Sequence, residues 1–204
     1  MTTRVLPLLA AAALVLADVT GTHRATFRVP SSNRYDRRLH RFVGAVSQHA
    51  VVSVGVNAPT FDGLVRTVAA DLLLAHTRAR YDGDALPALV AEAGGPDLTL
   101  LFNDVRPVYS RGDHAGPGTP LSQLLQRPHH PEVSWELLHE YNADITLYLR
   151  LSLTEGRTVM DVAADVSCLS RPDIERFLLA TEQLLVRAAP ADLALPARAF
   201  TAWS

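Results

Sequence analysis

A group of polar side chains follows a short apolar run in the middle of the chain. Asn103, Asp104 and Arg106 come directly after residues 98–102, which are apolar except for Thr99. A strand covered on both faces has this composition, and the carboxyl end of such a strand is a usual place for a ligand crevice. The three residues are therefore candidates for substrate binding, while the alternative is that Asn103 and Asp104 bond backbone amides in an ordinary turn.

A second candidate group consists of four arginines, Arg34, Arg37, Arg38 and Arg41, which lie within eight residues. Guanidinium groups bind phosphate through paired hydrogen bonds, so this group could hold a phosphate group of a ligand or dock an acidic protein. Because Asp36 lies among the arginines and aromatic residues are sparse, the same composition is also typical of a solvated charged surface.

Metal, thiol and lysine chemistry find little support. His129, His130, His139 and Glu140 offer possible ligands, but no helical histidine pair with a third ligand is visible, so we expect no metal site. Cys168 is the one cysteine, which excludes an intramolecular disulfide and a multi-cysteine zinc site. All 19 basic residues are arginine, which excludes a Walker lysine and a lysine general base.

The composition predicts a folded protein. The 204 residues are 48% hydrophobic and 20% charged, which suits a single domain over residues 1–204 with its own core. The formal net charge of -2 provides no overall attraction to nucleic acid or to an anionic membrane. We therefore expect neither as a partner.

The periodicity of apolar residues predicts an α/β (α+β) fold, with a mixed, largely antiparallel-edged sheet flanked by helices. The elements follow in chain order: helix 3–19, strands 25–29 and 50–56, helices 60–80 and 84–93, strand 98–102, a hairpin of strands 145–154 and 159–166, and a helix capped by Ser170 that ends near residue 189. Pro30 indicates a turn after the first strand. Frequent Pro and Gly predict a long crossover loop at about residues 105–134.

The apolar run of residues 5–17 has two interpretations. With Arg4 in front of it, it has the form of a cleavable secretory leader, and at 13 residues it is too short to span a bilayer. Alternatively, it belongs to a buried helix rich in Ala and Leu that ends at Gly21. The physics of the sequence alone does not separate the two.

Several motifs carry a family resemblance. In chain order they are the Ala/Leu-rich helix at 6–17, Thr20 with Gly21, the strand at 25–29, Asn33 with Arg34, the turn from Val43 and Gly44 through Ser47 and Gln48, and the final helix containing residues 174–177. In these motifs and their order the chain resembles the C-terminal half of the condensation domains of nonribosomal peptide synthetases, within the superfamily of CoA-dependent acyltransferases.

The resemblance implies the C-terminal subdomain of a chloramphenicol-acetyltransferase-like fold, in which residues 6–17 form a core helix and the protein stays in the cytoplasm. It places Ser47 and Gln48 near a substrate tunnel, although a polar turn before a strand is the more common explanation. It also implies phosphopantetheine-tethered substrates and no bound cofactor. The partner that it implies is a carrier protein, docked by Arg34, Arg37, Arg38 and Arg41.

The chain departs from the family at the residues that do chemistry. The family joins two carrier-bound groups into an amide with the second His of a His-His-x-x-x-Asp-Gly motif, which lies in the N-terminal half that we expect this chain to lack. His129 and His130 do not reproduce the motif, because Ser134 and Trp135 stand where Asp and Gly are required. Residues 78–86 also lack most of the family's His-Gln-Asp-x-Pro-Phe-Glu stretch.

We therefore expect the C-terminal lobe of an amide-forming acyltransferase that carries no catalytic residue of its own and is inactive alone. Such a lobe would have an apolar face for a separate N-terminal lobe or for self-association. One alternative is a carrier-protein or acyl-group binding module without chemistry. Another is a secreted globular protein whose leader is cleaved.

Overall fold

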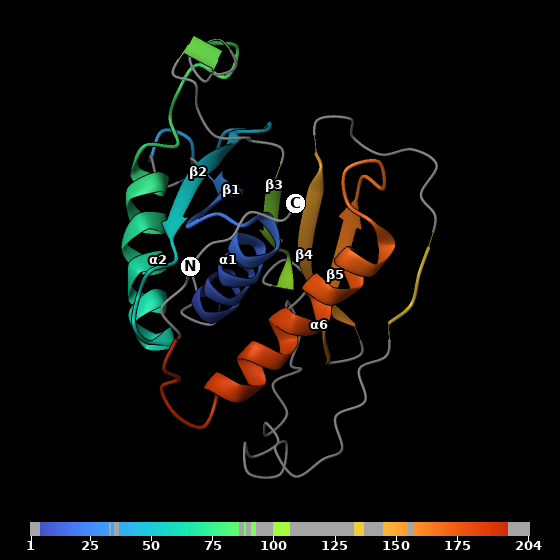
Figure 1. The fold of residues 1–204 in the computed structure, drawn as a ribbon. Coiled ribbons are helices and arrows are strands. Elements are labelled where there is room, and N and C mark those ends of the chain that lie inside the picture. Colours follow the sequence, from blue (N-terminus) through green and yellow to red (C-terminus); the bar gives the residue numbers. More distant parts are fainter. Residues whose placement is uncertain are drawn as a thin grey trace.

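The computed structural model describes residues 5–32, 34, 37–85, 88, 91–92, 100–106, 133–136, 145–154 and 157–195. Its elements are α1 (Leu6–Thr20), β1 (Arg24–Ser32), β2 (Ser47–Gly55), α2 (Phe61–Thr77), β3 (Leu100–Asp104), β4 (Leu147–Thr154), β5 (Arg157–Ala164) and α6 (Arg171–Ala188), as drawn in Figure 1. The predicted order of these elements is confirmed. Half of the residues of the helix predicted at 84–93, and residues 107–132 of the crossover loop, lie outside the described residues.

Helix α1 is the centre of the core. Its residues from Leu8 to Ala17 are all buried, as expected for a helix that is apolar on every side. The helix begins at Leu6 because Pro7 is tolerated only in the first turn, and it ends at Gly21, whose left-handed φ of 67° closes the last turn. In the structure the apolar run forms a buried helix, as the second interpretation expects. Cleavage after Ala17 would remove this helix from the core.

The five strands form one mixed sheet in the order β2-β1-β3-β4-β5. The two outer pairs, β1 with β2 and β4 with β5, are antiparallel. The two inner pairs, β1 with β3 and β3 with β4, are parallel. The prediction of a mixed sheet with antiparallel edges is therefore confirmed, and so is the central position of β3.

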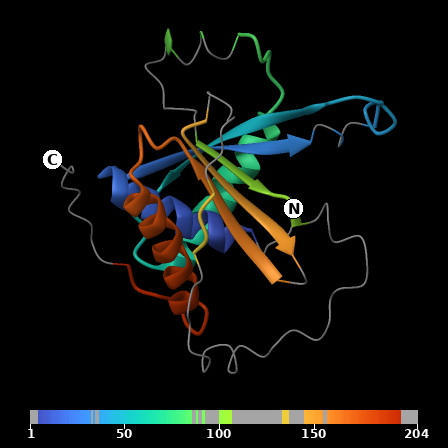
Figure 2. The same cartoon turned by 90° about the vertical axis from the view of Figure 1, so that its right-hand side faces the viewer.

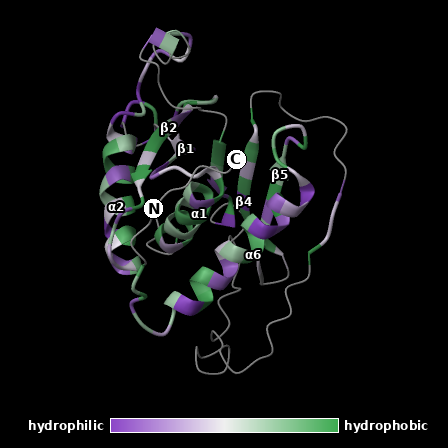
Figure 3. Cartoon of the chain, in the orientation of Figure 1, coloured by the Kyte–Doolittle hydropathy of each residue, from purple (hydrophilic) through white to green (hydrophobic). Residues whose placement is uncertain are grey.

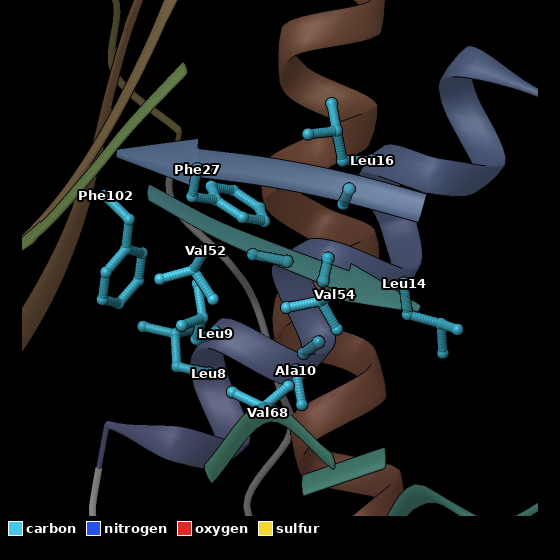
Figure 4. Packing of buried hydrophobic residues seen from close by; sticks show 14 of the residues in the cluster. Leu8, Leu9, Ala10, Leu14, Leu16, Phe27, Val52, Val54, Val68 and Phe102 are labelled. Atoms are coloured by element: carbon cyan, nitrogen blue, oxygen red, sulfur yellow. The ribbon is translucent and has the colours of Figure 1, made fainter. Parts of the chain in front are cut away.

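The three long helices cover one face of this sheet, with α1 between α2 and α6 (Figure 1). Side chains that alternate along the strands point into the helices, among them Phe27, Val52 and Phe102, which lie near Leu8 and Leu9 of α1 in Figure 4. The helices differ in hydropathy, as Figure 3 shows: α1 is hydrophobic along most of its length, whereas α2 and α6 mix hydrophobic and hydrophilic residues. We call the opposite side of the sheet the outer face.

Three strands run further than the sequence predicted. Strand β2 begins at Ser47 and not at residue 50, so Ser47 and Gln48 lie in the strand and not in a turn before it. Strand β1 continues through Pro30 to Ser32, because around this proline it pairs with β2, whereas among the described residues it pairs with β3 only at Arg28. Proline is tolerated where one side of a strand needs no ladder hydrogen bond. Strand β3 continues through Asn103 and Asp104, so these residues lie in the strand and not in the turn after it.

Helices α2 and α6 begin at side-chain caps. The Thr60 hydroxyl accepts a hydrogen bond from the Gly63 amide at 3.1 Å, and the Ser170 hydroxyl accepts one from the Asp173 amide at 3.3 Å. The Ser170 hydroxyl also donates to the Asp173 carboxylate. These contacts satisfy amides that have no partner within the helix.

We predict that Ser170→Ala lowers the free energy of unfolding by about 1 kcal/mol, because the Asp173 amide loses its side-chain acceptor and the Asp173 carboxylate loses the hydrogen bond from the Ser170 hydroxyl. Urea unfolding followed by circular dichroism measures this change. A variant as stable as the wild type would show that the cap contributes nothing.

Candidate functional site

Most of the candidate residues gather at one edge of the sheet. Strands β1, β3 and β4 run parallel, so their carboxyl ends meet at the same edge, and their arrowheads point the same way in Figure 2. Strand β2 begins there, with Ser47 opposite Ser32. The prediction that the polar group after residues 98–102 lies at the carboxyl end of the sheet holds in this geometry.

Asn103 lies on the outer face, in contact with the neighbouring strand. Its side-chain amide donates to the Tyr148 hydroxyl at 3.2 Å. Tyr148 pairs in register with Leu101, and Leu101 pairs with Arg28, so one row on the outer face crosses the three parallel strands. The phenol and amide groups could hydrogen-bond a carbonyl or amide group of a ligand laid across this row.

Asp104 and Arg106 bind each other. The guanidinium donates to both carboxylate oxygens, at 2.8 and 3.0 Å, and the Arg106 backbone amide donates to the carboxylate at 3.1 Å. The Asp104 side chain is only 10% exposed. This paired geometry fixes the turn at the end of β3, as the alternative interpretation of these residues required, and engages the Asp104 carboxylate within the chain.

Sequence reasoning missed a polar group on the hairpin. Arg150 and Ser152 of β4 both donate to the Asp161 carboxylate of β5, at 3.2 and 3.1 Å. Arg150 pairs in register with Asn103, so this group continues the polar part of the outer face. The alternation of β4, which places Tyr148, Arg150 and Ser152 on one side, was the signal that could have identified it.

Ser47 and Gln48 point to opposite sides of β2. The Gln48 side-chain amide donates to the Tyr81 carbonyl at 2.6 Å, and the Tyr81 hydroxyl donates to the His49 carbonyl at 2.7 Å. Gln48 therefore ties the segment after α2 to the start of β2. Ser47 is exposed on the side of the outer face. The structure does not bring these two residues into contact with Asn103 or with the Asp104–Arg106 pair.

His76 of α2 and Ser31 of β1 are in contact on the helix-covered face of the sheet. The His76 Nδ1 and the Ser31 hydroxyl are 2.9 Å apart, and Ser31 is only 3% exposed. Burial lowers the pKa of His76 below 6.5. Burial, followed by the charge of the Arg28 guanidinium, lowers the pKa of His49 in the same direction. Since Ser31 is buried in the core, this pair is suited to holding α2 against β1 and not to attacking a substrate.

The lowered pKa values of His49 and His76 predict a loss of stability in mild acid. Because the pKa in the fold is lower than in the unfolded chain, the stability linked to each neutral imidazole is complete above about pH 6.5 and is lost as the pH falls through the lower folded value. We expect the melting temperature to fall between about pH 7 and about pH 5. His76→Asn should reduce this fall, whereas His40→Asn, at an exposed position, should leave it unchanged. Equal falls in both variants would contradict the prediction.

The arginine group lies at the tip of the β1–β2 hairpin. We call residues 34 and 37–46 the arginine tip, and Figure 2 shows it at the far end of the hairpin, away from the helices. The Arg34 guanidinium donates to the carbonyls of Leu39, Phe42 and Gly44 at 3.1, 2.8 and 2.9 Å. Arg37, Arg38 and Arg41 are exposed. Arg34 therefore shapes the loop, and the other three arginines provide its charge.

The remaining candidate residues that the structure describes add no functional group to the site. His129, His130, His139 and Glu140 lie outside the described residues. Trp135 stacks on the Arg171 guanidinium, 4.3 Å from the ring centroid. Cys168 is exposed, and among the described residues no group of three or more His, Cys, Asp and Glu side chains could hold a metal ion. No helix within the described ranges has both the length and the apolar character needed to cross a membrane.

No family model and no curated protein sequence matches the chain. Solved structures do match it in fold. The starter condensation domain of the rhizomide synthetase RzmA superposes with a TM-score of 0.59 at 15% identity, over 100% of this chain and 46% of that chain. The first condensation domain of the calcium-dependent antibiotic synthetase, in complex with a substrate analogue, gives 0.56 at 18% identity, over 98% and 41%.

The PapA2 acyl transferase gives a TM-score of 0.60 at 14% identity, over 90% of this chain and 38% of that chain. The fold is that of condensation and acyl transferase domains. The chain spans between 20% and 46% of the length of such solved chains, so it corresponds to about half of a condensation domain or less. The resemblance deduced from the sequence is confirmed at the level of this fold.

Proposed function

We propose that the chain is the C-terminal lobe of a two-lobed acyltransferase of condensation type, which acts in the biosynthesis of nonribosomal peptides or related natural products. The coverage of the structural matches is the observation that carries this proposal. Nearly all of this chain superposes on condensation domains, yet it accounts for less than half of their length. A second lobe, in the same polypeptide or in another, would supply the proton-transferring histidine.

The outer face of the sheet supports this role. Helices occupy one side of the sheet, and the other side presents the Tyr148–Asn103 pair and the group of Arg150, Ser152 and Asp161. These side chains already have partners within the sheet, so they form a polar surface of defined geometry. A second lobe placed over this surface would enclose a tunnel lined with hydrogen-bonding groups.

The substrates that fit this role are acyl or aminoacyl groups tethered to phosphopantetheine on carrier proteins, in the cytoplasm and without a bound cofactor. The amine of one group would attack the thioester carbonyl of the other, so that an amide bond forms and the thiol of the arm leaves. The base for the amine lies in the second lobe, and this chain's part is to orient the two arms and exclude water.

Reconstitution tests the proposal. The chain is mixed with the product of the reading frame immediately upstream of its gene, and amide formation from two loaded carrier proteins is followed by mass spectrometry. We expect product only when both proteins are present, and loss of product when the second His of a His-His-x-x-x-Asp-Gly motif in the upstream protein is replaced by Ala. Product from this chain alone, or no product from the pair although the upstream protein carries the motif, would contradict the proposal.

A second candidate function is a carrier-binding module without chemistry, and the exposed Arg37, Arg38 and Arg41 favour it. The same mixture separates the two functions. A module of this kind would bind carrier protein and yield no amide under any combination, and replacement of Arg37 and Arg38 would abolish the binding.

A further inference from the structure

We propose that the arginine tip is a preformed docking surface for an acidic carrier protein, with Phe42 and Val43 as its apolar anchor and Arg34 as its internal clamp. The identity of the partner rests on the proposed function. The surface itself is argued from the tip's own geometry.

Arg34 acts as a clamp inside the loop. Three backbone carbonyls, of Leu39, Phe42 and Gly44, converge on one guanidinium at 2.8–3.1 Å. A planar guanidinium with five donors can hold three carbonyls at once, whereas a flexible loop in water would leave them to solvent. The Arg34 guanidinium is therefore engaged within the chain, where it fixes the shape of the loop.

Gly44 completes the fixed shape. Its φ of 149° is one that side-chain-bearing residues rarely adopt, and a Cβ placed there would lie 2.7 Å from Cε1 of the Phe42 ring. The ring therefore packs against the glycine backbone. Phe42 is held in place from two sides, by this contact and by the bond from Arg34 to its carbonyl.

The loop holds two apolar side chains towards solvent. Val43 is 96% exposed and Phe42 is 51% exposed, and they are neighbours in the chain at the end of a protruding hairpin (Figure 2). Single exposed apolar residues need no explanation, but an adjacent pair in a clamped loop is the arrangement of an interface anchor. Arg37, Arg38 and Arg41 are exposed in the same loop, so the tip carries positive charge beside its apolar pair.

The charge selects the partner. The protein as a whole has a net charge of -2, so the tip is a local basic site on a slightly acidic molecule. An apolar centre inside a charged rim has the anatomy of a protein interface. Two side chains offer little area for insertion into a bilayer, so an acidic protein surface with a shallow apolar pocket fits better than an anionic membrane.

The test uses a fluorescent holo acyl carrier protein as the probe, and anisotropy gives its dissociation constant. We expect Phe42→Ser with Val43→Ser to weaken binding by at least about tenfold, as anchor residues do. Leu73→Ser is the matched control, because Leu73 is an apolar residue of α2 that is 69% exposed, and it should bind as the wild type does. Replacing Arg37, Arg38 and Arg41 by Gln should weaken binding and remove most of its salt dependence.

Arg34→Gln should weaken binding without changing the midpoint of urea unfolding, because only the loop loses its shape. Wild-type binding in the Phe42 and Val43 variant, or no binding by the wild type, would overturn the proposal. Binding to vesicles of phosphatidylserine and phosphatidylcholine through the same two residues, without carrier binding, would overturn it in favour of a membrane. If the tip variants bind carrier protein as the wild type does and amide still forms, only the docking surface is refuted. If carrier protein binds through the tip and no amide forms, only the acyltransferase role is refuted.

Discussion

Replacing Ala12 by aspartate should leave the protein unfolded at room temperature. Ala12 is completely buried at the middle of α1, between the sheet and the two other long helices. The core cluster that the described residues form around α1 is hydrophobic, so a carboxylate there would be buried without a charged partner, which costs several kcal/mol. Since domains of this kind are stable by only about 5–15 kcal/mol, the substitution consumes most of that margin.

Circular dichroism and size-exclusion chromatography of the variant measure this outcome. Ala70→Asp is the matched control, because Ala70 is exposed within α2 and the same change of residue there meets water. We expect the control to unfold at nearly the wild-type urea concentration. A folded Ala12→Asp protein with wild-type stability would mean that α1 does not lie in the core.

Replacing Phe102 by alanine should be the next most damaging change. Its side chain is 1% exposed in β3, the central strand that joins the β1–β2 pair to the β4–β5 pair. In Figure 4 its ring lies close to Val52 and to Leu9 of α1. Removing a buried ring of this size leaves a cavity and costs about 3–5 kcal/mol.

Urea unfolding of Phe102→Ala measures this loss. Leu73→Ala removes a comparable apolar side chain from an exposed position, so we expect it to change the free energy of unfolding by less than about 0.5 kcal/mol. Similar losses in both variants would show that β3 is not packed against α1.

The elements of the fold could be read from periodicity because each has a clear apolar stripe. The alternation in residues 147–153 and the helical spacing from Phe61 to Ala75 correspond closely to β4 and α2. The ends were less predictable. Pro30 and Asn103 are turn-forming residues in isolation, but pairing with neighbouring strands keeps both in the sheet, and pairing is a property of the assembled fold.

The site could be predicted only in part, because spacing does not show which polar groups satisfy each other. The sequence placed Asn103, Asp104 and Arg106 in one group, yet Asp104 is engaged by Arg106 while Asn103 faces Tyr148 from the other side of the strand. The spacing of the four arginines also suggested one group, but the Arg34 guanidinium is bound to carbonyls of its own loop. Long-range contacts such as Arg150 with Asp161 depend on strand register, which the alternation leaves open.

Hydrogen–deuterium exchange of the native protein, followed by mass spectrometry, tests the central claim that this chain is a lobe built around the buried helix α1. Amides of residues 9–17 should be among the slowest to exchange, at the rate set by global unfolding. Exchange of those amides within seconds, while β4 and α6 stay protected, would show that the helix is not part of the core and would contradict the account.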